Sequence, residues 1–296
     1  ADNTLTVDGD HYDSVVDPWT YIDGTPNTEG WYLSANRVYK ASITPARAVN
    51  LTSLYAFNWD VNDVVVNLGI HTNIAARNFV AVIAYITNAV TTSRTGQWLF
   101  TTRDGVNWSG GQISTNIGGG EGGFNNPKRA ALFVSAHNPG HLFTMDKSSS
   151  TNARLLKNTN YGVGAWSTLA NINVGTSGQP IAIFIPYPNN SDDGVIFICT
   201  RANIVEEQYR FWVYDHGTVT ELSDLVETGG HRNNFGVGFT ALGMDTYPND
   251  RNKLRIMRID RQGFGITSFG GHYVTSDDGG ASFINGALLY SHSITD

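Results

Sequence analysis

The sequence predicts an all-β fold built from repeated strand pairs, and three observations lead to this prediction. Its longest apolar runs are short, rich in Val, Ile, Phe and Tyr, and separated by Gly, Asn and Pro, as β-strands and their turns are. Strand–turn–strand units recur about every fifty residues, near the upper end of the periods of repeated β architectures. No long segment has helical periodicity. We therefore expect one β domain that spans residues 1–296.

Four pairs of predicted strands can be superimposed in chain order. The first strands of the pairs are residues 79–85, 130–136, 181–187 and 238–244, and the second strands are residues 97–101, 141–145, 195–199 and 253–257. An earlier copy is predicted at residues 32–40. The turns within the last three pairs contain Pro or Gly beside Asn or Asp, which hairpin connections require. Residues 202–209 are expected to form a short helical turn or an edge insertion, and residues 211–217 a strand that runs into a turn.

Composition and charge exclude several classes of protein. The chain has 19 Lys and Arg against 26 Asp and Glu, and no block of basic residues, so a nucleic-acid partner is not expected. No apolar run reaches the eighteen or so residues of a membrane helix, so membrane insertion is not expected either. The abundance of Asn, Thr, Ser and Gly with little Lys resembles secreted and virion-surface β proteins. An extracellular or virion-surface location is therefore expected.

Two segments carry a turn motif with a defined chemistry. Residues 276–283 read Ser-Asp-Asp-Gly-Gly-Ala-Ser-Phe, and residues 102–108 read Thr-Arg-Asp-Gly-Val-Asn-Trp. An aspartate in such a turn can accept hydrogen bonds from turn amides, a glycine supplies positive φ, and the final aromatic ring packs back on the strands. We expect structural roles for the residues of both motifs, which are Asp104, Gly105, Trp108, Ser276, Asp278, Gly280 and Phe283.

These segments resemble the Asp-box, or BNR repeat, of the sialidase-like β-propeller superfamily, in which such hairpins recur once per blade. The resemblance implies a single β-propeller with six blades of about fifty residues each, and with five or seven blades as alternatives. A β-sandwich or jelly roll also has regular short strands and is the alternative fold. The motif implies a fold and names no activity.

A candidate binding site follows from the radial geometry of a propeller. The segments that lead into the first strands gather around the central axis, and here they are rich in Gly and in polar side chains that suit a ligand such as a sugar. The predicted ligand-binding residues of these axial loops are His71, Asn73, Arg77, Glu121, Arg129, Gln179, His231, Arg232 and Asn233. Aromatic residues on loops, for example Trp19, Tyr21, Trp31 or Phe124, can stack against sugar rings. Ordinary solvated loops explain the same composition equally well.

Catalytic and metal-binding motifs are weakly represented. The Arg-Ile-Pro segment of sialidases is absent, so their mechanism is not carried over and no catalytic residue is assigned. Asp60, Glu121 and Asp245 are conceivable members of a carboxylate pair for glycoside cleavage. The acidic cluster at residues 8–13 can in principle bind calcium but departs from the EF-hand pattern, so no metal and no cofactor are predicted.

The leading hypothesis for function is a non-catalytic recognition module, extracellular or on a virion surface, that binds a glycan or a protein partner. The first alternative is a glycoside hydrolase or lyase with an active site at the axial face. The second is a structural or decoration subunit that assembles into a larger particle through its blade edges.

Overall fold

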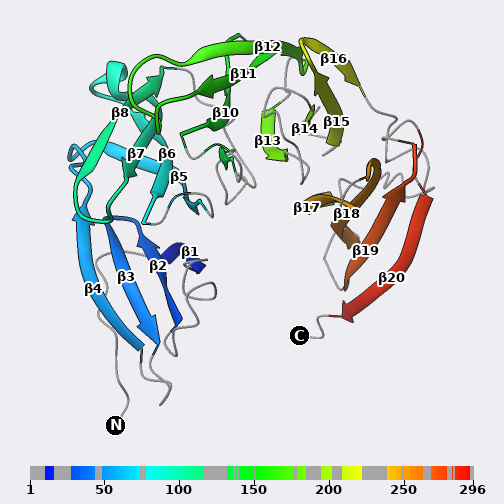
Figure 1. Cartoon of the computed structure of the whole chain (residues 1–296), viewed down its shortest axis with the longest axis horizontal. Helices are drawn as coiled ribbons and strands as arrows, with labels where there is room; N and C mark the ends of the chain where they lie inside the picture. Colours follow the sequence, from blue (N-terminus) through cyan, green and yellow to red (C-terminus); the bar gives the residue numbers. More distant parts are fainter. Residues whose placement is uncertain are drawn as a thin grey trace. The chain divides into compact units, whose positions relative to one another are not determined.

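The computed structural model describes residues 11–16, 28–43, 49–73, 76, 78–115, 132–135, 138, 140–149, 151–175, 179–184, 195–201, 209–221, 239–247, 250–262, 268–278, 282 and 284–293. Within these residues the chain forms five four-stranded sheets, and the only helical segment is the 3₁₀ turn η1 (Thr92–Arg94). In each sheet the strands are neighbours in the order in which they follow along the chain (Figure 1). The predicted all-β class is confirmed.

Five meanders therefore succeed one another along the sequence. The first sheet contains β1 (His11–Val16), β2 (Thr28–Ser34), β3 (Arg37–Ile43) and β4 (Val49–Ala56). The second contains β5 (Asp63–Thr72), β6 (Val80–Asn88), β7 (Gly96–Thr102) and β8 (Trp108–Ser114). The third contains β9 (Leu132–Val134), β10 (Leu142–Lys147), β11 (Asn152–Asn158) and β12 (Ser167–Asn173). The fourth contains β13 (Gln179–Phe184), β14 (Val195–Arg201), β15 (Tyr209–Asp215) and β16 (Thr218–Glu221). The fifth contains β17 (Phe239–Tyr247), β18 (Asp250–Gln262), β19 (Ser268–Ser276) and β20 (Ile284–Ser293).

The chain divides into two compact units. One unit comprises Ala1–Asp146 with Leu156–Thr168, and the other comprises Lys147–Leu155 with Leu169–Asp296. The first and second sheets lie in the first unit, the fourth and fifth lie in the second, and the third sheet contributes strands to both. The single domain over residues 1–296, the number of blades and the closure of a ring stay predictions.

The second sheet is packed on both faces, and β6 explains why. Its side chains alternate between the two faces, as in any β-strand. Val80 and Val82 belong to a buried cluster shared with Trp31 of the first sheet, whereas Ala81 and Ile83 belong to a second buried cluster. The second cluster also contains Leu132 and Leu142 of the third sheet. β6 has apolar residues at consecutive positions because it is an inner strand of a sheet that is covered on both faces by other sheets.

The first strands of successive sheets also meet in the first unit. β5 contacts β1 and β2 of the first sheet, and it contacts β9 of the third. A sheet that contacts its neighbours through its first strand and covers them with both faces is arranged as a blade is in a propeller. The described part of the chain has no helix long and apolar enough to cross a membrane.

The strand pairs of the sequence prediction need one correction. Of the predicted strand 79–85, residues 80–85 lie in β6, the second strand of its sheet, and residues 97–101 lie in β7, the third. The true first strand of this sheet is β5, which the prediction missed. Residues 32–40 form most of the β2–β3 hairpin rather than one strand. By contrast, residues 211–215 do run along a strand, β15, into a turn at His216 and Gly217, as predicted.

Candidate functional site

The structure describes the side chains of only two of the nine predicted axial residues, His71 and Asn73. His71 is the penultimate residue of β5, and Asn73 follows that strand, with 2% of its surface exposed. Gln179 is the first residue of β13, and its side chain is outside the described part. Six further predicted residues lie outside the described residues: Arg77, Glu121, Arg129, His231, Arg232 and Asn233.

The order of strands in the sheet changes the expected position of His71 and Asn73. They stand where β5 ends and the chain turns towards β6, whereas Gln179 stands where the first strand of its sheet begins. The two ends of a strand lie at opposite ends of its sheet, along the strand direction. The predicted set therefore mixes residues from the two ends of first strands. The segment that leads into β5 is residues 57–62 instead.

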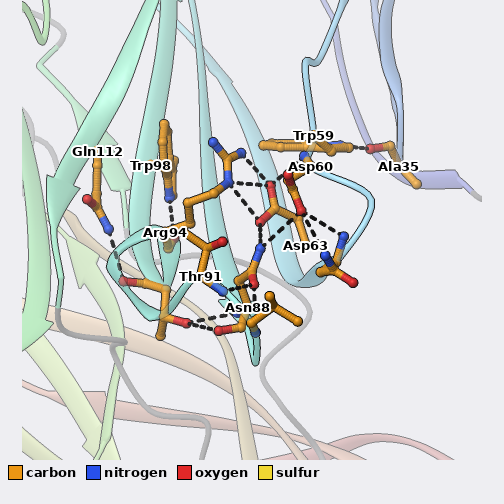
Figure 2. A network of polar contacts seen from close by, with 12 residues as sticks. Ala35, Trp59, Asp60, Asp63, Asn88, Thr91, Arg94, Trp98 and Gln112 are labelled. Atoms are coloured by element: carbon orange, nitrogen blue, oxygen red, sulfur yellow. Dashed lines mark hydrogen bonds and ion pairs between the residues drawn. The ribbon is translucent and has the colours of Figure 1, made fainter.

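A polar network is built at the beginning of β5 (Figure 2). The Asp63 side chain has no exposed surface, and its Oδ2 accepts the backbone N–H of Asp60 at 2.8 Å. Its Oδ1 accepts Nδ2 of Asn88 at 2.8 Å and Nε of Arg94 at 3.0 Å, and Nη2 of Arg94 donates to Oδ2. Asp63 and Asn88 face each other across β5 and β6, so the register itself brings these groups together.

The ion pair has a clear electrostatic consequence. The hydrogen bond from Arg94, with those from Asn88 and the Asp60 amide, lowers the pKa of Asp63 to about 2 against the opposing effect of burial. Asp63 therefore stays ionised at neutral pH. It is suited to hold an arginine and unsuited to donate a proton.

Asn88 also shapes the connection that carries Arg94. Its Oδ1 accepts the backbone N–H groups of Val90 at 3.0 Å and Thr91 at 2.6 Å. The carbonyl of Thr91 in turn accepts the N–H of Arg94, the last residue of η1. Side-chain bonds of asparagine to nearby amides favour such turns. The sequence Asn-Ala-Val-Thr-Thr-Ser-Arg at residues 88–94 therefore aims one arginine at β5.

Aromatic rings complete this end of the sheet. The Arg94 guanidinium lies 5.1 Å from the ring centre of Trp98, and Trp98 Nε1 donates to the carbonyl of Arg94 at 3.0 Å. Trp59 stacks on Phe57 with 4.8 Å between ring centres, and its Nε1 donates to the Ala35 carbonyl of the first sheet. Both tryptophans are half-buried. We refer to Trp59, Asp60, Asn62, Arg94 and Trp98 as the Trp59–Trp98 patch.

The patch combines polar groups that point in a fixed direction with apolar ring surface. Asp60 and Asn62 are exposed, and Asp60 Oδ1 accepts the Asn62 amide at 2.9 Å in the turn before β5. Phe100 lies near both tryptophans, with its ring centre 5.5 Å from that of Trp59 and 6.5 Å from that of Trp98. Every bond in the patch joins residues of one compact unit. Such an arrangement can stack an apolar ring face and bond its polar edge.

Sequence reasoning found only Asp60 of this patch, as a conceivable acid, and it misjudged one tryptophan. Trp31, proposed for an exposed loop, is 3% exposed within the core cluster. Trp19, Tyr21 and Phe124 lie outside the described residues. The sequence did contain a signal for the patch, because Trp59 stands directly before the turn sequence Asp-Val-Asn-Asp. The signal was not used because β5, the strand that follows this turn, was not predicted.

The first turn motif closes the β7–β8 hairpin. Asp104 Oδ1 accepts the amides of Val106 at 2.8 Å and Asn107 at 2.7 Å, and it accepts the Thr102 hydroxyl at 3.1 Å. Gly105 has φ +76°, the left-handed conformation that such a turn requires. Hydrogen bonds from Asn107 and Val106 hold the pKa of Asp104 well below its usual range. Asp104 therefore acts on the turn itself.

Trp108 closes the same motif on the apolar side. Its ring stacks on Tyr55 of β4, with 4.9 Å between the ring centres. It packs against the buried cluster between the first two sheets. The aromatic residue at the end of the motif thus links its hairpin to the neighbouring sheet.

The second turn motif lies between β19 and β20 and also centres on an aspartate that accepts bonds from its own turn. Asp278 Oδ1 accepts the Ser276 hydroxyl at 2.8 Å and the Ser282 amide at 2.9 Å. The Ser282 hydroxyl and amide lower the pKa of Asp278 to about 2. Gly280 and Phe283 lie outside the described residues. Membership of both motifs in the Asp-box family stays a prediction.

Metal sites have little support among the described side chains, where no group of three or more His, Cys, Asp or Glu could hold an ion. The calcium candidate at residues 8–13 falls outside those side chains. Asp245 lies in β17, but its side chain is also outside them.

Comparison with known proteins identifies a fold. No family model matches the chain, and no curated protein matches it. Among solved structures, a polysaccharide lyase of family PL25, an ulvan lyase bound to -[GlcA(1-4)Rha3S]-, is 9% identical with a TM-score of 0.53. The match covers 95% of this chain and 70% of that one. The fold is β-propeller-like.

Two further solved structures are less similar to this chain. A fucose-specific lectin from Aleuria aurantia is 10% identical with a TM-score of 0.48, over 88% of this chain and 73% of that one. A GH43 β-1,3-galactosidase is 11% identical with a TM-score of 0.48, over 90% of this chain and 92% of that one. A likeness of fold at this level of identity does not separate binding from catalysis.

Proposed function

We propose that this chain is a non-catalytic recognition module that binds glycans through the Trp59–Trp98 patch. The observation that carries the proposal is the placement of Arg94 between a buried carboxylate and the Trp98 ring, beside a second half-buried tryptophan. An extracellular or virion-surface location is part of the proposal and rests on composition alone.

Sugars match the chemistry of this patch. One face of a sugar ring is apolar and packs on aromatic rings, while its hydroxyl groups need donors and acceptors at the ring edge. Trp59 and Trp98 supply the apolar surface, and Asp60, Asn62 and Arg94 supply the polar groups. The Asp63 bonds hold Arg94 before any ligand arrives, so little side-chain freedom is lost on binding.

The state of the Asp63 carboxylate favours binding of a glycan without its cleavage. Glycosidases use two carboxyl groups, one of which must be protonated near neutral pH to act as the acid. The lowered pKa of Asp63 and its bonds to Arg94 favour a permanently ionised structural group. A glycoside hydrolase or lyase remains the alternative to be tested, with Glu121 as its candidate acid. A structural or decoration subunit of a larger assembly is the second alternative.

A glycan-array screen, followed by a hydrolysis assay on every glycan bound, tests the proposal. Binding without turnover is expected, and Trp59→Ala and Arg94→Ala should each weaken it at least about tenfold, as loss of a central contact does. Arg103→Ala is the matched control, because Arg103 also stacks on an aromatic ring, Tyr161 at 4.1 Å, outside the patch.

Each other outcome favours a different function. Turnover of a bound glycan that is lost in Glu121→Gln would establish the enzyme alternative. Equal loss of binding in Arg94→Ala and Arg103→Ala would move the site away from the patch. Absence of binding to every glycan would favour a structural role or a protein partner.

A further inference from the structure

The charge of the Trp59–Trp98 patch restricts the glycans that it can take. Arg94 is its only cation among the described residues, and Asp63 already neutralises it through two guanidinium nitrogens. The Asp60 carboxylate is added on the exposed side, so the patch and Asp63 together carry one net negative charge. The whole chain carries a formal charge of −7.

Arg37, the arginine among the described residues of the first sheet, has a hydrogen bond on the other face of that sheet. Arg37 pairs with Ala56 at the end of β4, which brings it to this end of that sheet. Val38 belongs to the cluster between the first and second sheets, so the adjacent Arg37 side chain points to the other face. There its Nη1 donates to the hydroxyl of Ser53 at 3.2 Å.

The hydrogen-bonding groups of the patch also favour neutral sugars over anionic sugars. A carboxylate only accepts hydrogen bonds, so exposed Asp60 suits the hydroxyl donors of a sugar and repels a sugar carboxylate or sulfate. Arg94 bonds Asp63 through Nε and Nη2 and lies against Trp98, so its charge is already paired with a carboxylate, and its remaining N–H groups suit the hydroxyl oxygens of a neutral sugar.

We infer that the patch selects uncharged glycans over glycans that carry carboxylate or sulfate groups. The inference rests on the proposed function and adds the class of ligand to it. Ring stacking on Trp59 and Trp98 supplies affinity for either class, and the Asp60 and Asp63 charges supply the discrimination.

The test uses a set of glycan pairs on the full chain. Each pair contains a neutral oligosaccharide and the same oligosaccharide with one added uronic acid, sialic acid or sulfate group. The neutral member should bind about threefold to tenfold more tightly at low ionic strength, as one exposed like-charge contact predicts. The ratio should approach one when the salt rises from about 0.01 M to about 1 M, because salt screens exposed charges.

Two variants that change the charge, and one neutral control, separate charge from structure. Asp60→Asn keeps an oxygen for the Asn62 amide and removes the charge, so the ratio should fall towards one. Val61→Lys adds a cation at a side chain that is 95% exposed and should reverse the preference, whereas Val61→Ser should leave it unchanged.

The results distinguish failure of the inference from failure of the function. Preferential binding of the charged members by the unmodified chain, sensitive to Arg94→Ala, would overturn the inference and leave glycan recognition intact. An unchanged ratio in both Asp60→Asn and Val61→Lys would also overturn it. Absence of binding to both members of every pair would overturn the proposed function together with the inference.

Discussion

At the scale of single residues, the Asp63–Arg94 ion pair stabilises the fold and holds Arg94 in the proposed site. Removing one partner of a buried, hydrogen-bonded pair leaves the other unsatisfied and typically costs several kcal/mol. Arg94 is 28% exposed and can partly recover water, so Asp63→Asn should lower the free energy of unfolding by about 2 kcal/mol. Denaturant titration measures this. Asp60→Asn, in the same turn, should change it by less than about 0.5 kcal/mol.

The same ion pair predicts a dependence on pH with a definite sign. The pKa of Asp63 is lowered from 3.8 to about 2 in the folded chain, so its stabilisation is complete above the unfolded value and is lost as the pH falls through about 2. The difference in unfolding free energy between the unmodified chain and Asp63→Asn should therefore be constant from pH 7 to about pH 5 and shrink below about pH 4. A difference that stays constant down to about pH 2 would contradict the ion-pair assignment.

At the scale of elements, the turn between the third and fourth strands is a repeated construction. Asp104 and Asp278 close this turn in the second and fifth sheets. In the third sheet Asn158 does so, because its Oδ1 accepts the amides of Asn160 and Gly162, both at 2.8 Å. Trp166 follows that turn as Trp108 follows the first, and it packs against the cluster between the second and third sheets. The aspartate motif did not predict this turn, because the amide oxygen of Asn158 accepts the hydrogen bonds in place of a carboxylate.

Hydrogen exchange tests the turn construction. In Asp104→Ala the amides of Val106 and Asn107 lose their acceptor, so their exchange should become faster while that of the β6 amides is unchanged. Arg103→Ala, at the adjacent position, should preserve both amides. Slow exchange of Val106 and Asn107 in Asp104→Ala would show that the turn does not depend on the carboxylate.

The β7–β8 pair tests packing within an element. A Cβ on Gly110 would lie 2.3 Å from Cδ1 of Phe100, whereas a Cβ on Gly111 would meet no atom within 4 Å. Gly110→Ala should therefore lower the free energy of unfolding by about 1–3 kcal/mol, as overpacking does. Gly111→Ala should be neutral or slightly stabilising. Thermal or denaturant unfolding of the two variants side by side gives the comparison.

At the scale of the whole molecule, cooperativity tests the predicted single domain. If residues 1–296 fold as one domain, tryptophan fluorescence and far-ultraviolet circular dichroism should report one coincident unfolding transition. Two separated transitions would instead assign independent stability to the two compact units. The seven tryptophans provide the signal for the first probe.

The sequence alone determined the strand-rich class, most strand positions and the two aspartate turns. These follow from local causes, which are short apolar runs, turn residues and a carboxylate within reach of its own amides. It did not identify β5, because the apolar residues of this strand, Val64–Val66, Leu68 and Ile70, are interrupted by Asn67 and Gly69 and form a shorter continuous run than those of β6. Without β5, the order of strands in the second sheet was shifted by one.

Tertiary structure decided the candidate site. Arg94 meets Asp63 only because β5 pairs with β6 in a register that sets Asp63 opposite Asn88, 25 residues further along the chain. Trp59 and Trp98 both come to lie beside Phe100 only when the β4–β5 connection, which carries Phe57 and Trp59, packs on the second sheet. Local propensity encodes a strand or a turn, but it contains no information on which distant strand will be the partner. The residues proposed to bind a glycan are therefore set by sheet pairing and packing.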